Sequence, residues 1–357
     1  MLLKLVKRAE VDKKKSLQIR LLAVLGALLV VSIFLAALKL NPISVYGTMV
    51  KGAFGSPYSI RQTIIQAIPL LIAGLGIAIA FKMEFWNIGG EGQILMGAFG
   101  AALIGLKFPN TPRFFLLVAM FITGAVIAGI WALIPTYFRI KWKTNETITT
   151  LMMNYIALKF VTYLQYGPWK DATALGFPKI PNFSDNATLP EIFGIHIGWI
   201  IALVIAVLVH IYMNYTKKGY EVSVIGASEK TALYAGMDIK KTVLGALFLS
   251  GAICGIAGVI QASAVSQTLS VQVSGGAGYT AIIVAWLGYL SSFGITLVSV
   301  LFAGLLAGGR FIQTAFGIPE SAAFILQSTI LFFVLGSELF IRFKIKFASP
   351  EKIKEVA

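Results

Sequence analysis

This sequence of 357 residues has little cysteine, little histidine and few charged side chains. Its single cysteine, Cys254, excludes an intramolecular disulfide framework, and its two histidines, His196 and His210, are too far apart to form a metal-ligand motif. Only 13% of the residues are charged and 57% are hydrophobic, whereas about a quarter of a soluble domain is charged. A water-soluble fold cannot bury this much apolar surface, so the composition favours a bilayer as the solvent.

Two kinds of motif are also missing from the sequence. It contains no GxxxxGK[ST] phosphate-binding loop, so any ATP that drives its function must bind to another chain. Its apolar segments carry no paired Asp, Glu, Ser or His residues of the kind that an intramembrane enzyme requires. We therefore expect no catalytic residue, no metal site and no cofactor bound by this chain.

Apolar runs of helix length predict an all-α polytopic membrane protein with about ten transmembrane helices. A β-barrel would instead show alternating segments of about 10 residues. The expected spans cover residues 21–38, 59–81, 91–106, 114–138, 146–166, 197–215, 243–265, 279–290, 295–308 and 321–341. The chain then divides into a basic N-terminus (1–20), a transmembrane domain (21–345) and a tail (346–357).

Two of the connections between the expected spans have features of their own. Residues 167–196 carry four of the 12 prolines and are expected to form an external loop. Residues 217–242 form a loop at the other face, and a connection of this length exceeds what most helical bundles need.

The positive charges are distributed unevenly, although the net charge is +15. With the N-terminus inside, 21 of the 30 Lys and Arg residues lie in inside segments and seven lie outside. The positive-inside rule then predicts an even number of spans with both termini in the cytoplasm. Charge spread over loops in this way does not suit a nucleic-acid partner.

Two glycine-rich breaks interrupt the apolar pattern, at Gly89-Gly90 and at Gly275-Gly276, 186 residues apart. Five expected spans fall in each half of the chain, and an odd number per half makes the second copy inverted. Inverted repeats with broken helices at the substrate site are found in many transporters. The alternative is a chance similarity, because the match is short and consists mainly of glycine.

Polar and aromatic side chains gather around these breaks. The candidate pathway residues are Trp86, Asn87, Gly89, Gly90, Glu91, Gln93, Asn154, Gln261, Gly275, Gly276 and Tyr279. Polar groups in hydrocarbon need a cavity or an internal partner, so these residues could line a path for solute. The alternatives are an ordinary turn between helices for the first break and helix–helix hydrogen bonds for the single amides. Trp86 and Trp286 add aromatic faces.

The inside loop at 217–242 is weakly amphipathic and rich in small residues. We expect a short helix along the cytoplasmic face that docks a partner, with a solvated connector as the alternative. Its candidate docking residues are Gly226, Ala227, Ser228, Glu229, Ala232, Ala235 and Gly236.

Three separated motifs resemble those of one transporter family. Residues 85–93, FWNIGGEGQ, resemble the FNIGxEGQ signature of nucleoside permeases of bacterial ABC uptake systems, in the branched-chain amino acid and simple-sugar permease superfamily. Residues 145–156 are similar to the family's NE-x-I-x-T-x-M-x-NYIA segment, and residues 226–258 to its coupling loop and the next helix. Trp86 is a departure from the signature and leaves the exact substrate open.

The resemblance implies a fold like that of the vitamin B12 permeases and a role as the permease subunit of an ATP-driven importer of nucleosides. It also implies a bacterial inner-membrane location and three partners: an ABC ATP-binding subunit that uses ATP and Mg, a second homologous permease, and a substrate-binding lipoprotein outside. Residues 226–236 would dock the ATPase, and the two breaks would line the path.

Two alternatives to this function stay open. A permease for simple sugars or branched-chain amino acids belongs to the same superfamily. An ion-coupled secondary transporter would instead need buried carboxylates near the broken helices, and Glu91 is the one good candidate.

Overall fold

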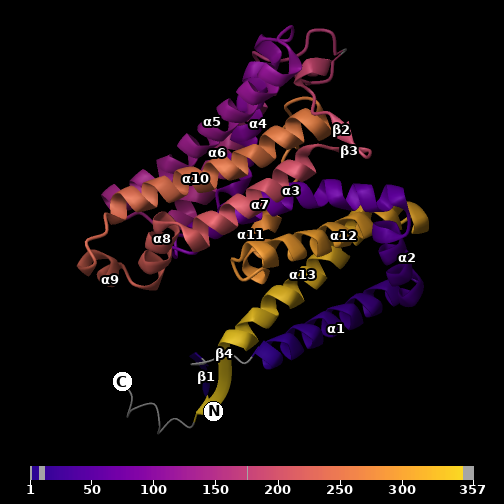
Figure 1. The fold of residues 1–357 in the computed structure, drawn as a ribbon. Helices are drawn as coiled ribbons and strands as arrows, with labels where there is room; N and C mark the ends of the chain where they lie inside the picture. Colours follow the sequence, from indigo (N-terminus) through magenta and orange to yellow (C-terminus); the bar gives the residue numbers. More distant parts are fainter. Residues whose placement is uncertain (1, 8–12, 175, 349–357) are drawn as a thin grey trace. The chain divides into compact units, whose positions relative to one another are not determined.

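The computed structural model describes residues 2–7, 13–174 and 176–348, and its architecture is almost entirely helical (Figure 1). The α-helices of the described residues are α1 (Lys13–Ala37), α2 (Pro42–Phe54), α3 (Pro57–Phe81), α4 (Gly90–Lys107), α5 (Arg113–Trp142), α6 (Glu146–Tyr166), α7 (Gly198–Tyr215), α8 (Lys217–Ala227), α9 (Glu229–Tyr234), α10 (Ile239–Ile260), α11 (Ala277–Leu287), α12 (Ser292–Phe316) and α13 (Glu320–Arg342). A 3-10 turn, η1 (Asp185–Ala187), and a π-helical turn, η2 (Gln261–Ser266), complete the helical elements. The strands β1 (Leu2–Lys7) and β4 (Phe343–Ala348) pair with each other, as do β2 (Glu191–Ile192) and β3 (Ile195–His196).

Each of the ten expected spans coincides with a helix, and the prediction of an all-α polytopic membrane protein is confirmed. Five helical segments of the described residues are by themselves long and apolar enough to cross a bilayer, namely α3, α5, α7, α10 with η2, and α12. A sixth candidate is the pair formed by α1 and α2, which is bent by 113°. The other expected spans are shorter or richer in glycine and polar residues, and α11, at 11 residues, is about 16 Å long.

The chain forms two compact units, which we describe separately. The terminal unit comprises Met1–Ile60 and Gly304–Ala357, and the central unit comprises Arg61–Ala303. The two boundaries fall inside α3 and α12.

The terminal unit holds both ends of the described chain together. Strands β1 and β4 are antiparallel, with Leu2 opposite Ala348 and Lys7 opposite Phe343. Helix α1 packs along α13, and the buried side chains between the helices of this unit are Val31, Leu35, Val45, Met49, Ile312 and Leu326.

One helix of the terminal unit was not expected. Residues 42–54 are less apolar than the neighbouring runs and lie between the first two expected spans, 21–38 and 59–81. They form α2 because Pro42 stands at its first turn and the Asn41 side chain caps it, accepting hydrogen bonds from the N–H groups of Ile43 (3.0 Å) and Ser44 (3.4 Å).

The central unit is built around α10, which packs against both α4 and α5. Small residues allow these helices to approach closely, as is typical of membrane helices. A Cβ at Gly251 would lie 2.5 Å from the Cβ of Ala132, and one at Gly258 would overlap the Ile94 carbonyl oxygen. The spacing of these helices is therefore set by glycine.

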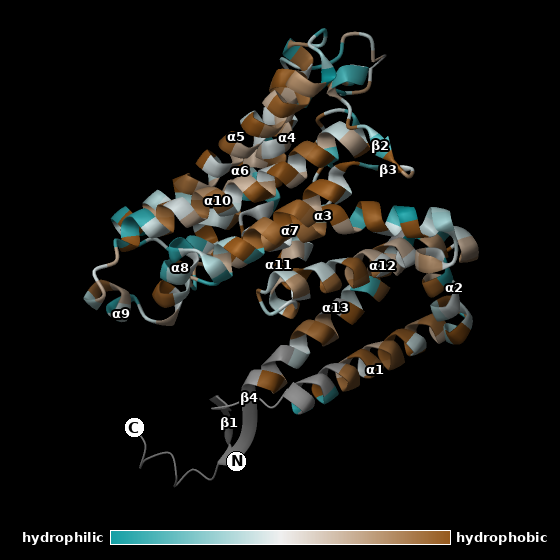
Figure 2. Cartoon of the chain, viewed as in Figure 1, coloured by the Kyte–Doolittle hydropathy of each residue, from teal (hydrophilic) through white to brown (hydrophobic). Residues whose placement is uncertain are grey.

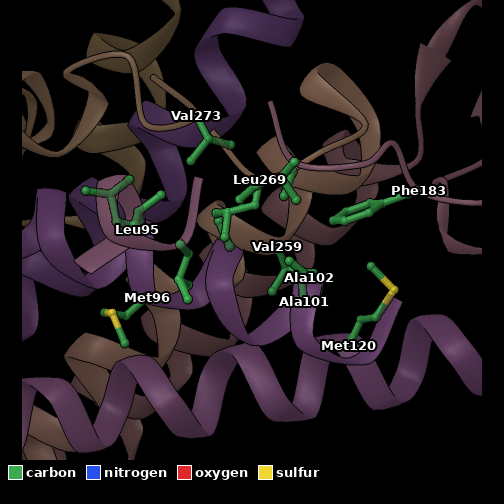
Figure 3. Close-up of a cluster of buried hydrophobic side chains, with 14 of the residues drawn as sticks. Leu95, Met96, Ala101, Ala102, Met120, Phe183, Val259, Leu269 and Val273 are labelled. Atoms are coloured by element: carbon green, nitrogen blue, oxygen red, sulfur yellow. The ribbon is translucent and has the colours of Figure 1, made fainter. Parts of the chain in front are cut away.

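The external loop contributes to the core of the central unit. Figure 3 shows Phe183 at the edge of a cluster of buried side chains that includes Leu95, Met96, Ala101, Ala102, Met120, Val259, Leu269 and Val273. The N–H of Phe183 donates to the Gln267 carbonyl (2.8 Å), and the Thr268 hydroxyl donates to that of Ile180 (2.9 Å). The loop is therefore anchored to the segment between η2 and α11.

The two ends of this bundle are hydrophilic, whereas the helices between them are apolar. Figure 2 shows apolar residues along α5, α7 and α10, and hydrophilic ones at α8 and around η1. Helix α7 follows β3 directly and ends just before α8, so the external loop and the 217–242 segment lie at opposite ends of the central bundle. The predicted helix in 217–242 is present as two short helices, α8 and α9.

Candidate functional site

The two glycine-rich breaks are in direct contact. The carboxylate of Glu91, in the first turn of α4, accepts hydrogen bonds from the N–H groups of Gly276 (3.0 Å) and Gly278 (2.8 Å). These groups form the start of α11, where the helix dipole favours a negative charge. A Cβ at Gly278 would overlap the Glu91 backbone nitrogen, and Gly276 has a φ of +75°, which favours glycine. The glycines therefore allow the two breaks to approach each other closely, and the hydrogen bonds to Glu91 hold them together.

Asn87 organises the chain before α4. It is fully buried, and its Oδ1 accepts from the N–H of Gly89 (3.0 Å) and from Nε2 of Gln93 (3.2 Å). Its Nδ2 donates to the Ser250 hydroxyl of α10 (3.3 Å) and to Gln93 Oε1 (3.4 Å). This amide pair holds the first break against α10.

Asn154 of α6 braces the same break from the other side. Its Oδ1 accepts from the N–H of Gly92 (2.8 Å), and its Nδ2 donates to the Ile88 carbonyl (2.9 Å) and contacts the Tyr279 hydroxyl (3.5 Å). The Thr150 hydroxyl accepts from the N–H of Ile88 (3.2 Å). Irregular backbone at membrane depth needs such partners, so α6 supplies the hydrogen bonds that the broken helix lacks.

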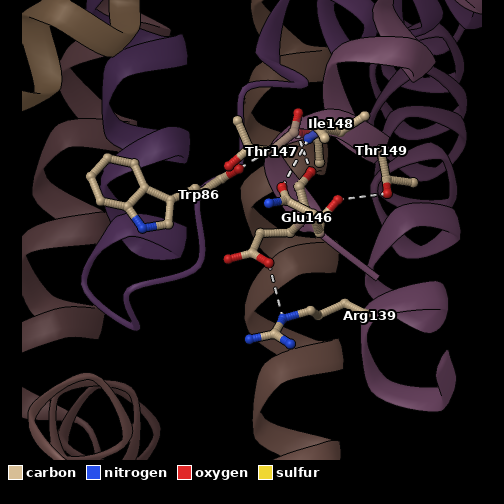
Figure 4. Close-up of polar contacts among 8 residues, drawn as sticks. Trp86, Arg139, Glu146, Thr147, Ile148 and Thr149 are labelled. Carbon is tan, nitrogen blue, oxygen red and sulfur yellow. Dashed lines mark hydrogen bonds and ion pairs between the residues drawn. The ribbon is translucent and has the colours of Figure 1, made fainter. Parts of the chain in front are cut away.

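The start of α6 is fixed by its own polar residues. The Asn145 side chain caps the helix by accepting from the N–H of Ile148 (3.2 Å). Glu146 forms an ion pair with Arg139 of α5 (3.0 Å), as Figure 4 shows, while the indole of Trp86 points away from this pair. The turn between α5 and α6 therefore keeps Asn154 in register with the break.

The accessible part of the site is aromatic. Trp86 is 45% exposed and Tyr279 is 40% exposed, whereas Asn87, Glu91, Gln93 and Asn154 are buried. The rings of Trp86 and Trp286 stack at 5.5 Å with an interplanar angle of 29°, and Phe81 lies 5.6 Å from both. We call Phe81, Trp86 and Trp286 the aromatic cluster.

The other predicted pathway residues are two glycines of the breaks, Gly90 and Gly275, and Gln261. Gly90 is buried, and a Cβ there would meet Ile77, while Gly275 is exposed with a φ of +54°. Gln261 opens the π-helical turn η2 and is half-buried, with no hydrogen bond from its side chain to either break. π-Helical turns are frequent at functional sites.

The predicted docking residues lie on α8, α9 and the turns that follow them. Gly226 packs on the chain before the first break, since a Cβ there would overlap the Lys82 carbonyl oxygen. Ser228 caps α9 by accepting from the N–H of Thr231 (3.2 Å), and Ala232 is buried. Four residues of this set are exposed, namely Ala227, Glu229, Ala235 and Gly236.

Glu221 links α8 to α10 by a hydrogen bond, and this contact was not predicted from the sequence. Its carboxylate accepts from Lys218 Nζ (2.7 Å) and from the Thr242 hydroxyl (2.8 Å). The hydrogen bond from Lys218, followed by that from Thr242, lowers the pKa of Glu221. Helix α8 is therefore held both to α10 and, through Gly226, to the connection between α3 and α4 that carries Trp86.

Thr150, Ser250 and Phe81 were also missed by the sequence analysis. In the sequence, each is an ordinary residue in or beside an apolar run. Asn154, by contrast, was predicted, because an amide in lipid requires a partner.

Comparison with known proteins identifies the family. Residues 59–335 match the family described as branched-chain amino acid transport system / permease component. The chain is 33% identical to the glucose ABC transporter permease protein TsgB13 of Haloferax volcanii, over 92% of this chain and 89% of that one. It is 30% identical to the guanosine ABC transporter permease protein NupP of Bacillus subtilis, over 92% and 95%. It is also 30% identical to the nucleoside ABC transporter permease protein NupB of Lactococcus lactis, over 90% and 92%.

These matches confirm the resemblance expected from residues 85–93 and cover most of the chain. All three relatives are named as permease proteins of ABC transporters. This chain belongs to the branched-chain amino acid transport system permease family, and it is an ABC-transporter permease.

Proposed function

We infer that this chain translocates nucleosides as the permease subunit of an ATP-driven importer in the bacterial inner membrane. This inference rests on the hydrogen bonding of the Glu91 carboxylate. Between Asn87 and Gln93, and between Gly275 and Tyr279, Glu91 is the only acidic or basic residue, and its carboxylate is occupied by Gly276 and Gly278. The breaks therefore offer no free charge to a solute.

A site without free charge favours a neutral substrate. A branched-chain amino acid carries an ammonium and a carboxylate, and each would need a partner in a dry site. A nucleoside has a flat, uncharged base, and the half-exposed Trp86 offers a flat face of the kind on which bases stack. Base–aromatic stacking contributes about 1–3 kcal/mol. Two of the relatives above are named as guanosine and nucleoside permeases, which supports this substrate class.

Glucose is the second candidate substrate. It is favoured by the similarity to the Haloferax volcanii glucose permease, and sugars also pack on aromatic rings. A sugar lacks a base, so it would depend on hydrogen bonds from Tyr279 and its neighbours more than on Trp86.

Uptake by the complete transporter in liposomes tests this proposal. We expect labelled uridine to accumulate only with ATP and the ATPase subunit, and unlabelled guanosine to compete where glucose and leucine do not. Trp86→Leu is expected to reduce nucleoside uptake about tenfold, which corresponds to the loss of one stacking contact. Phe115→Leu, on the exposed face of α5, is the control.

Three outcomes would overturn parts of the proposal. Competition by glucose alone would assign the transporter to sugars, and competition by leucine would assign it to amino acids. Uptake by this chain without the ATPase would remove the ABC mechanism.

The ATPase partner would bind at α8 and α9. These helices lie at the end of the central bundle that is expected to face the cytoplasm. Helix α9 exposes two apolar side chains, Leu233 (63%) and Tyr234 (93%). The substrate-binding lipoprotein would meet the opposite end, at residues 167–196, and a second permease would complete the path. ATP and Mg would be bound by the ATPase.

Loss of the two exposed side chains of α9 is expected to weaken ATPase binding. Exposed apolar anchors at an interface contribute about 2 kcal/mol or more. The double change Leu233→Ala and Tyr234→Ala should therefore reduce the ATPase that co-purifies with the permease by about tenfold or more, with the thermal unfolding of the permease unchanged. Phe177→Ala, equally exposed in the external loop, is the control. Normal co-purification of the double variant would move the docking surface away from α9.

A further inference from the structure

A cavity of about 150 Å³ lies in the central unit between α3, α7 and the start of α12. One wall is apolar, formed by Leu75, Ile79, Val209 and Ile295. The lining also includes Ala78, Met213, Leu290 and Phe293, and its polar part consists of one ammonium group, that of Lys82, together with His210, Asn214, Ser291 and Ser292. The cavity is distinct from both glycine-rich breaks, and the proposed transport mechanism does not use it.

The charge in this cavity is not neutralised. Among the residues that the structure describes, no carboxylate forms an ion pair with Lys82. Glu84, two residues further along the chain, is exposed and does not line the cavity. The cavity therefore presents a net positive lining to whatever enters it.

Polar groups around Lys82 add to its attraction for an anion. Ser291 caps α12, since its hydroxyl oxygen accepts from the N–H of Gly294 (3.2 Å), and Ser292 is the first residue of that helix. The positive end of the α12 dipole thus faces the cavity. Asn214 is oriented by its donation to the His210 carbonyl (2.9 Å).

The surface beside the cavity is suited to hydrocarbon. Along α7, an apolar face adjoins His210 and consists of Leu203, Val204, Val207, Leu208 and Ile211, each between 46% and 58% exposed. The cavity lies at the end of α7 that precedes Lys217 and Lys218, where basic residues mark the cytoplasmic side. An amphiphile could place its charged group at Lys82 and its chains along α7.

We propose that this cavity binds the phosphate headgroup of an anionic phospholipid from the cytoplasmic leaflet. Basic pockets between membrane helices on this side are suited to such headgroups. A free phosphate would use Lys82 but would gain nothing from the apolar wall or from α7, so the geometry favours the lipid. The site does not depend on which solute is transported.

Occupancy of this cavity would act on the coupling segment. The carbonyl of Lys82 is the atom against which Gly226 of α8 packs, and Lys82 directly follows Phe81 of the aromatic cluster. A headgroup bound to Lys82 would therefore steady the connection between the segment expected to bind the ATPase and the first break. Anionic lipid is expected to raise coupled ATP hydrolysis by the complete transporter.

Native mass spectrometry of the purified transporter tests the proposal, with phosphatidylglycerol and phosphatidylcholine as probes. We expect phosphatidylglycerol to be retained at least about fivefold more than phosphatidylcholine. Lys82→Ala should remove this preference, while Lys217→Ala, which removes an equal charge from the same end of the bundle, should keep it. Ser292→Glu provides a second test, because an acid in the first turn suits the helix but repels phosphate.

Three results would overturn this proposal. They are equal retention of the two lipids, unchanged phosphatidylglycerol retention in both Lys82→Ala and Ser292→Glu, and displacement of the lipid by millimolar inorganic phosphate. If Lys82→Ala does not fold, the Ser292→Glu result decides.

Discussion

Replacing Glu91 with Ala is expected to lower the free energy of unfolding of the central unit by about 3 kcal/mol or more. The variant loses two hydrogen bonds to a charged acceptor, and each such bond contributes about 1.5–3 kcal/mol. It also leaves the N–H groups of Gly276 and Gly278 without an acceptor in a dry environment. Thermal unfolding of the detergent-purified permease, followed by size-exclusion chromatography, would measure the loss.

Glu91→Gln separates this structural role from a role in proton coupling. Glutamine keeps the size of the side chain but has one acceptor oxygen and places an amide donor opposite another N–H group. We therefore expect a smaller but clear loss of stability, with the uptake of the remaining folded protein still dependent on ATP. Glu84→Gln, on the exposed turn six residues before α4 begins, is the matched control and should be neutral.

The rival function predicts a different result. If Glu91 carried protons in an ion-coupled transporter, Glu91→Gln would fold normally and would lose only uptake driven by a pH gradient. If Glu91→Gln has normal thermal stability and loses only the uptake driven by a pH gradient, Glu91 does not serve to hold the two breaks together.

The positions of the helices could be predicted from sequence because hydrophobic runs report directly on the bilayer. Helix α2 could not, since its formation depends on the Asn41 cap and Pro42 rather than on an apolar run. The segment 217–242 gave a helix signal, but its division into α8 and α9 follows from Ser228, which ends one helix and caps the next.

The breaks themselves were visible in the sequence as glycine pairs, but their contact was not. Glu91 and Gly276 are 185 residues apart, and no local pattern indicates that they meet. The burial of Asn87 and Gln93 was equally hidden, because a polar residue beside a span predicts a cavity wall and an internal brace alike. Lining of the path by these residues stays a prediction, and the exposed Trp86 and Tyr279 are its best-placed members.

The close approach of α4 and α10 gives the second large expected effect, through Gly258→Ala. A Cβ at this position would overlap the carbonyl oxygen of Ile94 and would lie 2.8 Å from the backbone nitrogen of Ala98. Backbone atoms cannot move aside as a side chain can, so the two helices must separate. Overpacking of a core costs about 1–3 kcal/mol where side chains can adjust, and we expect at least the upper value here.

Gly245→Ala is the matched control for Gly258→Ala. Gly245 lies on the same helix, and a Cβ there would meet nothing within 4 Å. Alanine is the better helix former by about 1 kcal/mol, so Gly245→Ala should be neutral or slightly stabilising. Folded yield in membranes, measured by fluorescence-detected chromatography of tagged protein, would compare the two variants.

Equal yields would show that α4 and α10 tolerate separation, and the packing of the central unit would then not depend on glycine at this crossing. A selective loss in Gly258→Ala would instead connect the crossing to the site, because α4 carries Glu91 and any displacement of α4 stretches its hydrogen bonds to Gly276 and Gly278.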